Sequence, residues 1–339
     1  MKIEVYFSVY HTLHNPPFEL SRGKQQEYFE NPQRLKNILK ILEQDPEVFE
    51  IHPNFSTNVP DIKEVHSEKL LKFYAEISKY LSDDDYHIPD TFAVPKISHL
   101  PEDITKRSGY FCFDSATPIT RRTFSASLNA ASTVVKAAQK ILTDKNKIVY
   151  AAVRPPGHHA GKDYFGGYCY LNNSALGAHV LSKKGRVAIL DIDYHHGNGT
   201  QEIFYDSDRV FFVSLHANPA YAFPYFWGYP EEIGEGPGEG WNLNIVLEDD
   251  ADNRAYLQKL GYALDAISKK DIDYLIISLG VDTLFSDPVG GMMLTEHIFE
   301  EMGREISKLK LPTLIVQEGG YDLTQVGKCV LNFLTGFLG

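Results

Sequence analysis

Short apolar runs alternate with amphipathic segments along most of the second half of the chain. Each run is almost entirely apolar and rich in β-branched residues, which is typical of strands buried on both faces. These runs span residues 147–153, 186–193, 209–216, 274–282 and 313–321. The segments between them have helical spacing, as in the one whose Tyr256, Leu260 and Ile267 share a face. The pattern predicts an α/β fold with a mostly parallel central sheet and helices on both faces.

The first half of the chain is less regular. Its opening residues alternate like a strand, and amphipathic stretches further on predict helices. We expect helices over 33–42, 67–81 and 123–141, with long loops across 83–118. No internal repeat and no linker interrupts the pattern, so we interpret residues 1–339 as a single domain.

Unusual polar residues follow four of the predicted strands, each at the carboxyl end. They are His158 and His159, the cluster from Asp191 to Asn198, Asp282, and Tyr321. In open α/β sheets ligands bind along this edge, so the four clusters are expected to converge in one crevice. If the chain stays extended through LDID, alternation places Asp191, Asp193 and His195 on one side. The competing interpretation is a polar turn whose acids face water.

Three of these residues have the chemistry of a metal site. Asp193 and Asp282 each offer an oxygen and His195 offers a nitrogen. Three protein ligands of this type leave a fourth position open, which is typical of catalytic rather than structural zinc. Alone, Asp282 would be interpreted as a helix cap or turn residue. Together with the first cluster it is better explained as a ligand.

The tandem histidines in RPPGHH follow a strand on a stiff loop that contains two prolines and a glycine. A lone histidine is more often a hydrogen-bonded core group, but His158 and His159 opposite a metal site indicate proton transfer. Asp191 and Asn198 are available as partners. An aspartate partner keeps one imidazole readily protonated, and an asparagine partner leaves the other less basic.

Two further motifs contain several glycines. In EGGY, Gly319 and Gly320 let the backbone approach a site closely, and Tyr321 can donate a hydrogen bond to an oxyanion. Alone, that tyrosine would be interpreted as an aromatic wall. The segment GEGPGEG, 234–240, only loosely matches a dinucleotide-binding loop, because it contains a proline and two acids and lacks a strand-to-helix context. We interpret it as a flexible rim loop.

Composition narrows the function classes. The chain is 43% hydrophobic and 23% charged, which is ordinary for a globular protein, and its net charge of −12 argues against nucleic-acid binding while suiting a cationic substrate. Cys112, Cys169 and Cys329 are widely spread and odd in number, which is typical of a reducing compartment. No signal-peptide block and no membrane-length apolar run is present, so the cytoplasm is the expected location and no membrane partner is expected.

Together, these motifs carry a family resemblance. RPPGHHAG, GGYCYLNN, LDIDYHHGNGTQEIFY, VSLH, SLGVDT and EGGYDL resemble the histone deacetylase superfamily, in order and spacing, over essentially the whole chain. The segment AFPYFWGYPEEIGEGPGEG most resembles the bacterial acetylpolyamine amidohydrolase branch. The resemblance implies an arginase/deacetylase-like three-layer α/β fold and one zinc ion per chain.

The resemblance also implies roles for individual residues. It places zinc on Asp193, His195 and Asp282, makes His158 and His159 the acid/base pair and Tyr321 the carbonyl polariser, and puts Tyr168, Phe223 and Gly167 in the wall of a narrow tunnel. We assign His159, beside Asn198, as the general base, and His158, paired with Asp191, as an electrostatic stabiliser. Many members of the superfamily hold potassium beside the zinc, on groups that match Asp191, Asp193, His195, Ser214 and Leu215.

The resemblance leads to a substrate hypothesis, a slender acetylated polyamine, in a cytoplasmic enzyme that is implied to form a homodimer. Candidate partners for the cationic amine are Asp114, Glu231, Glu232 and Glu235. Three positions depart from the pattern of polyamine-selective relatives. Thr105, Ala116 and Val289 stand where such relatives carry glutamate, and Tyr168 stands where many relatives carry phenylalanine. The alternatives are an acetyl-lysine or protein deacetylase, a two-manganese ureohydrolase and a non-catalytic acyl-amine binder.

Overall fold

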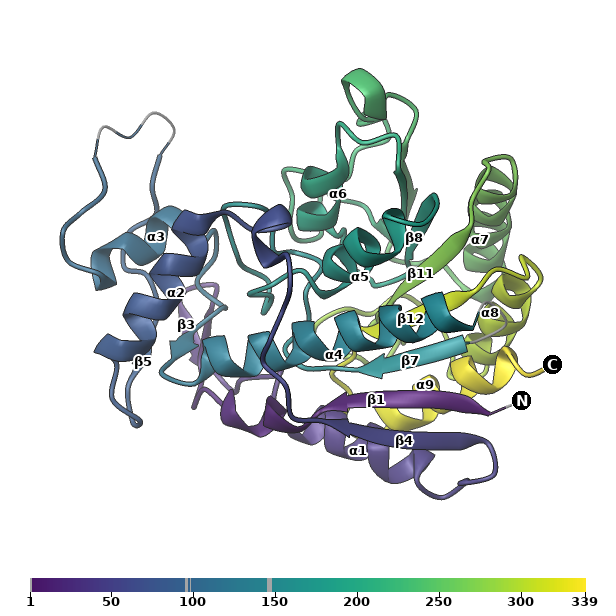
Figure 1. Ribbon diagram of the computed structural model, residues 1–339, viewed down its shortest axis with the longest axis horizontal. Helices are drawn as coiled ribbons and strands as arrows, with labels where there is room; N and C mark the ends of the chain where they lie inside the picture. The colour runs from purple at the N-terminus through teal and green to yellow at the C-terminus, as the bar shows by residue number, and fades with distance from the viewer. Residues whose placement is uncertain (1, 95–96, 98, 145–147) are drawn as a thin grey trace.

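A parallel sheet lies at the centre of the computed structural model, which describes residues 2–94, 97, 99–144 and 148–339 (Figure 1). Its strands are β1 (Ile3–Ser8), β4 (Phe49–Asn54), β7 (Ile148–Ala152), β8 (Val187–Asp191), β9 (Val210–Ala217), β10 (Asn242–Leu247), β11 (Tyr274–Leu279) and β12 (Thr313–Gln317). Their order is β10-β9-β8-β11-β12-β7-β1-β4, and each neighbouring pair is parallel. The expected parallel sheet is therefore confirmed.

Helices cover both faces of this sheet. The helices are α1 (Gln33–Leu42), α2 (Glu68–Tyr80), α3 (Ser108–Phe111), α4 (Thr123–Thr143), α5 (Asn173–Ser182), α6 (Asn198–Phe204), α7 (Asn253–Ser268), α8 (Ile298–Ser307) and α9 (Val326–Gly336). Helices α4 and α5 pack together on one face, and α1, α7, α8 and α9 cover the other (Figure 1). The three layers predicted from the alternation are present.

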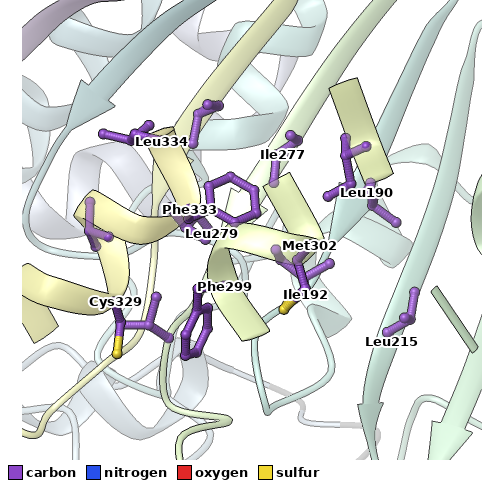
Figure 2. Close-up of a cluster of buried hydrophobic side chains, with 14 of the residues drawn as sticks. Leu190, Ile192, Leu215, Ile277, Leu279, Phe299, Met302, Cys329, Phe333 and Leu334 are labelled. Atoms are coloured by element: carbon purple, nitrogen blue, oxygen red, sulfur yellow. The ribbon is translucent and has the colours of Figure 1, made fainter. Parts of the chain in front are cut away.

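Strand β8 illustrates why the apolar runs become central strands. Ala188 and Leu190 point into the core beneath α1, α7, α8 and α9, whereas Val187 and Ile189 point into the core beneath α4 and α5. Figure 2 shows part of the first core, where Leu190 and Ile277 from the sheet lie among side chains of α8 and α9. Since both faces are buried, such a strand is apolar until its carboxyl end, where Asp191 stands in β8.

Several elements differ from the expectation. The edge strands β4 and β10 and the helix α8 were not predicted, and residues 83–118 contain α3 and a two-residue strand, β5 (Tyr86–His87), which pairs with β6 (Ile119–Thr120). Lys147, the first residue of one predicted strand, lies outside the described residues. Strand β10 was missed because its buried positions include Asn242 and Asn244, whose amides donate hydrogen bonds to Gln201.

The long opening segment folds over the carboxyl edge of the sheet. It contains a hairpin of β2 (Glu19–Ser21) and β3 (Lys24–Gln26). Short 3-10 helices lie at Val9–Leu13, Ile62–Glu64, Thr105–Arg107 and Gly236–Gly238. No helix in the part of the chain that the structure describes combines the length and the apolar character needed to cross a bilayer.

Candidate active site and metal centre

The four polar clusters converge because the strands they follow are neighbours. Strands β8, β11, β12 and β7 are consecutive in the sheet, and their carboxyl ends meet at one edge. One detail differs from the expectation. Strand β8 ends at Asp191, so Asp193 and His195 lie on the irregular turn after it rather than on an extended chain. The turn, not strand alternation, brings their side chains together.

The three proposed metal ligands lie within reach of a single ion. Ligand atoms of Asp193, His195 and Asp282 all lie within 4.8 Å of one another. The Nδ1 atom of His195 lies 3.3 Å from Asp193 Oδ1 and 3.1 Å from Asp282 Oδ2. All three residues are buried to at least nine-tenths. Two carboxylates and one neutral imidazole fit a divalent ion of the zinc type, because they offset its charge and leave a coordination position open.

Neighbouring backbone amides hold these carboxylates in place. Asp193 Oδ2 accepts a hydrogen bond from Gly319 N at 2.8 Å, and Asp282 Oδ1 accepts one from Tyr194 N at 2.9 Å. A Cβ atom on Gly319 would lie 2.6 Å from carboxylate oxygens of both Asp193 and Asp282. The close approach expected of the EGGY backbone is confirmed at this glycine, where a larger residue would push the ligands apart.

The two histidines have different partners. His158 Nδ1 lies 3.0 Å from Asp191 Oδ2, and His159 Nδ1 lies 2.7 Å from Asn198 Oδ1, so both pairings suggested by the sequence are present. Burial opposes a charged imidazole at both. At His158 the carboxylates of Asp193 and Asp191 outweigh it and raise the pKa to about 10. At His159 burial and the neighbouring His158 lower the pKa well below its ordinary value. The two environments therefore shift the pKa values of the paired histidines in opposite directions.

The buried carboxylate of Glu318 binds the backbone of the loop that carries the two histidines. Glu318 Oε2 accepts hydrogen bonds from the backbone N–H groups of Gly157 at 2.6 Å and His158 at 3.2 Å. Burial raises the pKa of Glu318 to about 7. Glu318 was not among the predicted site residues, although its place directly after an apolar strand is the signal shared by the other residues of the site.

Tyr321 lines the same cavity as His159 and His195. Its ring packs against the Arg34 guanidinium at 4.5 Å, and it contacts the Tyr168 ring at a centroid distance of 5.5 Å. The backbone N–H of Tyr321 donates to Asp287 Oδ2 at 2.6 Å. Burial raises the pKa of the Tyr321 hydroxyl well above its usual range, so the group stays a hydrogen-bond donor.

The cavity above these residues has a volume of about 660 Å³. The four residues proposed to contact substrate, Tyr168, Phe223, Gly167 and Asp114, all line it. Phe223 contacts the His159 ring at a centroid distance of 5.0 Å. Gly167 has φ +56° and a Cβ there would lie 2.3 Å from His159 Cδ2, so only glycine fits beside the histidine.

Asp114 is fully engaged by the protein. Its carboxylate accepts hydrogen bonds from the backbone N–H groups of Gly167 and Ala116 and from the Thr117 hydroxyl. Burial raises the pKa of Asp114. Its contacts indicate that it shapes the loop beside Gly167, with little remaining capacity for an amine.

The acids proposed at the rim lie elsewhere. Glu231, Glu232 and Glu235 do not line the cavity, and Glu232 instead accepts hydrogen bonds from Gln201 Nε2 and Gly228 N. None of residues 234–240 lines it either, and Gly238 packs against residues 205–207, because a Cβ there would lie 2.4 Å from Tyr205 O. The rim interpretation of this segment was wrong, because glycine-rich composition does not say which way a loop folds.

The cavity is also lined by Glu19, an acid that no sequence motif predicted to be part of the site. Glu19 lines it from the β2–β3 hairpin, together with Arg22 and Lys24. No pattern marked Glu19, since it stands alone in an irregular opening segment. Of the three departures from the polyamine-branch pattern, Ala116 and Val289 line the cavity; Thr105 does not, and it donates instead to Asp103.

The residues proposed to hold potassium also lie close together. Asp191 on β8 is the register partner of Ser214 on β9, and Leu215 follows Ser214. The Ser214 hydroxyl lies 3.2 Å from His196 Nδ1 and 2.8 Å from His216 Nδ1.

Comparisons with known proteins agree with this arrangement. Residues 28–337 match the histone deacetylase domain. The chain is 38% identical to acetylpolyamine amidohydrolase 2 of Pseudomonas aeruginosa over 335 residues, covering 97% of each chain, and 37% identical to the acetylpolyamine amidohydrolase of Mycoplana ramosa over 346 residues, covering 99% of this chain and 100% of the other. The crystal structure of an acetylpolyamine aminohydrolase from Burkholderia pseudomallei superposes with a TM-score of 0.93 at 31% identity, covering 99% of this chain and 98% of that one. The fold is the arginase/deacetylase fold, and the chain belongs to the histone deacetylase family.

Proposed function

We propose that this protein is a zinc-dependent amidohydrolase that removes an acetyl group from the primary amine of an acetylated polyamine. The observation that carries the proposal is one cavity lined by His159, His195 and Tyr321 above the metal-ligand cluster. Nearly full-length similarity to proteins named acetylpolyamine amidohydrolase supports the substrate class.

Asp193, His195 and Asp282 would hold one zinc ion per chain. Their donor set and mutual distances fit that ion. When bound, zinc acts as a Lewis acid toward the amide carbonyl and the attacking water.

His159 is the proposed general base. Asn198 Oδ1 accepts from His159 Nδ1, so Nδ1 carries the proton and Nε2 is left to accept one from the attacking water. The lowered pKa of His159 keeps the imidazole neutral before the reaction. The Asn198 amide group itself donates to the Tyr164 hydroxyl at 3.3 Å, which supports this orientation.

His158 and Tyr321 stabilise the charge that develops on the substrate. The Asp191 carboxylate beside His158 favours the protonated imidazole, which would supply positive charge near the reacting carbonyl. The Tyr321 hydroxyl donates a hydrogen bond to the carbonyl oxygen as it becomes an oxyanion. Tyr168 and Phe223 form walls suited to a methylene chain.

The proposal also includes a potassium site, the domain organisation, the location and the oligomeric state. A potassium ion on Asp191, Asp193, His195, Ser214 and Leu215 would neutralise the acids beside the zinc site; the cross-strand pairing of Asp191 with Ser214 supports it. We retain one domain over residues 1–339, a cytoplasmic location and a homodimer as parts of the same proposal, with light scattering as the test of the dimer.

The test is a comparison of kcat/KM for N-acetylputrescine, N8-acetylspermidine and an acetyl-lysine peptide, with zinc and after chelation. We expect zinc-dependent turnover with the polyamines preferred. A peptide preference of tenfold or more, about 1.4 kcal/mol in the transition state, would assign a protein or lysine deacetylase instead. Manganese-dependent urea release would assign a ureohydrolase, and binding without turnover would assign an acyl-amine binder.

A further inference from the structure

The cavity wall contains a buried carboxylate that the proposed chemistry does not use. Glu19, the first residue of β2, is 1% exposed and lines the same cavity as His159 and Tyr321. Neither its position in the chain nor its neighbours in sequence connect it to a motif of the active site.

The contacts of Glu19 leave one oxygen open. Its Oε1 atom accepts hydrogen bonds from Gln26 Nε2 at 2.7 Å and from the Tyr168 hydroxyl at 3.0 Å. Its Oε2 atom is buried and has no side-chain hydrogen-bond partner among the described residues; the backbone N–H of Phe29 is the other donor that faces the carboxylate. A buried carboxylate oxygen without a partner is costly, so a donor from a ligand would be stabilising here.

Tyr168 places this carboxylate along the path of a substrate chain. Its ring contacts the Tyr321 ring, and its hydroxyl contacts Glu19. Tyr168 therefore links the Glu19 carboxylate to Tyr321, the residue proposed to face the reacting carbonyl, within one cavity wall.

The charge changes sign further out on the same hairpin. Arg22 and Lys24 are exposed and line the cavity at the turn that connects β2 to β3. A single ammonium beside Glu19 is attracted to the wall, whereas an additional ammonium that reaches this turn is repelled.

We propose that Glu19 forms an ammonium-binding subsite, fixed by Tyr168 and Gln26 and bounded outside by Arg22 and Lys24, and that it selects monoacetylated diamines over longer acetylated polyamines. This inference rests on the proposed deacetylase function and names its substrate class. The free ammonium donates to Glu19 Oε2 while the acetamide lies at the metal centre.

The electrostatics of the wall support an ion pair at Glu19. Burial raises the pKa of Glu19 to about 7, although hydrogen bonds from Gln26, Tyr168 and the backbone N–H of Phe29 oppose the shift. An ammonium beside the carboxylate would lower that pKa again and keep the group ionised. Asp114 does not compete, because backbone N–H groups and Thr117 already occupy its oxygens.

The first test compares N-acetylputrescine with N-butylacetamide, which has the same chain length and no ammonium. The ratio of kcat/KM for the cationic to the neutral amide should fall about tenfold to a hundredfold in Glu19→Gln, which is the range for one charged hydrogen bond. Glu231→Gln, an exposed acid outside the cavity, is the matched control and should leave the ratio unchanged.

Calorimetric binding of N-acetylputrescine to the metal-free protein gives a readout that is independent of turnover. The affinity for N-acetylputrescine should fall in Glu19→Gln and remain at the wild-type value in Glu231→Gln. Circular dichroism checks that both variants fold. Unchanged ratio and affinity in Glu19→Gln would overturn the subsite while leaving the deacetylase function standing. If no amide is hydrolysed by the zinc-loaded protein, the proposed function itself fails.

The second test varies the length of the amine. Wild-type protein should prefer N-acetylputrescine to N1-acetylspermine, and the double variant Arg22→Gln, Lys24→Gln should narrow that preference about twofold to fivefold, as expected for exposed charges. A wild-type preference for N1-acetylspermine, or an unchanged preference in the double variant, would overturn the restriction to diamines.

Discussion

The floor and the wall of the cavity are built in different ways. The floor consists of Asp193, His195, Asp282 and the two histidines, which all follow central strands and are held by backbone amides and buried partners. The wall is assembled from segments that are distant in the chain, including the β2–β3 hairpin and the stretches around residues 114–116, 223–225 and 288–289.

This difference separates chemistry from selectivity. The sheet edge fixes the floor, because moving one floor residue would disturb a strand end and its core. The wall residues lie on loops, which can change without disturbing the sheet. Substitutions at wall positions such as Ala116 and Val289 can therefore change the cavity while the floor stays the same. We expect floor variants to change kcat and wall variants to change the ranking of substrates.

The largest effect is expected at the floor. Asp282→Ala should lose the metal and about a thousandfold or more of activity, because several kcal/mol of transition-state stabilisation depend on the ion. Elemental analysis and activity measure both losses. Asp282→Asn retains an acceptor for Tyr194 N and separates loss of the ligand charge from loss of the loop structure. Stoichiometric metal and full activity in Asp282→Ala would contradict the assignment.

The next effect concerns the hydroxyl of Tyr321. Tyr321→Phe keeps the ring that packs on Arg34 and removes only the donor, so kcat should fall about a hundredfold or more with little change in KM. Steady-state kinetics on N-acetylputrescine measures the split. Tyr168→Phe is the corresponding variant in the wall. It should change the ratio of kcat/KM for the cationic to the neutral amide more than it changes kcat. Activity of Tyr321→Phe within about threefold of wild type would refute the role.

A smaller effect is expected when pH changes the charge of Glu19 in the wall and with it the preference for the cationic amide. Burial raises the pKa of Glu19 to about 7, so the carboxyl is neutral below that pH and charged above it. The cationic-to-neutral ratio should therefore fall as pH decreases through 7, up to about tenfold per unit. Asp114, Tyr168 and Tyr28 also face Glu19, so the profile is repeated in Glu19→Gln, where it should be flat. A dependence that persists in this variant would point to Asp114.

The smallest effect is expected from salt. Because Glu19 is buried, raising the ionic strength from 0.05 to 0.5 M should change the selectivity for N-acetylputrescine over its neutral analogue by less than about twofold. A strong salt dependence would instead assign cation recognition to exposed acids, as the sequence alone had suggested for Glu231 and Glu235. Initial-rate measurements at fixed pH distinguish the two.

The central layers of the fold could be predicted from the sequence because their pattern is local. Strands β8 and β11 are apolar apart from Asp191 and Ser278, and the amphipathic stretches of α4 and α7 have a clear helical period. The edge strands could not be predicted from the sequence, because β4 contains Pro53 and β10 buries two asparagines. The hydrogen-bond partners of these asparagines are distant in the chain. Their stability depends on contacts that a local pattern does not contain.

By itself the sequence determined the type of sheet, and it predicted the edge of the site and the candidate metal-ligand triad that the structure brings together, because each follows from residues next to an apolar strand. Only the tertiary structure decided that Glu19 lines the cavity, that Asp114 is occupied by backbone amides and that Glu232 lies outside the cavity. The physical reason is that strand ends converge by sheet geometry, whereas a loop acid acquires its neighbours, and therefore its charge and its function, from segments that are distant in the chain.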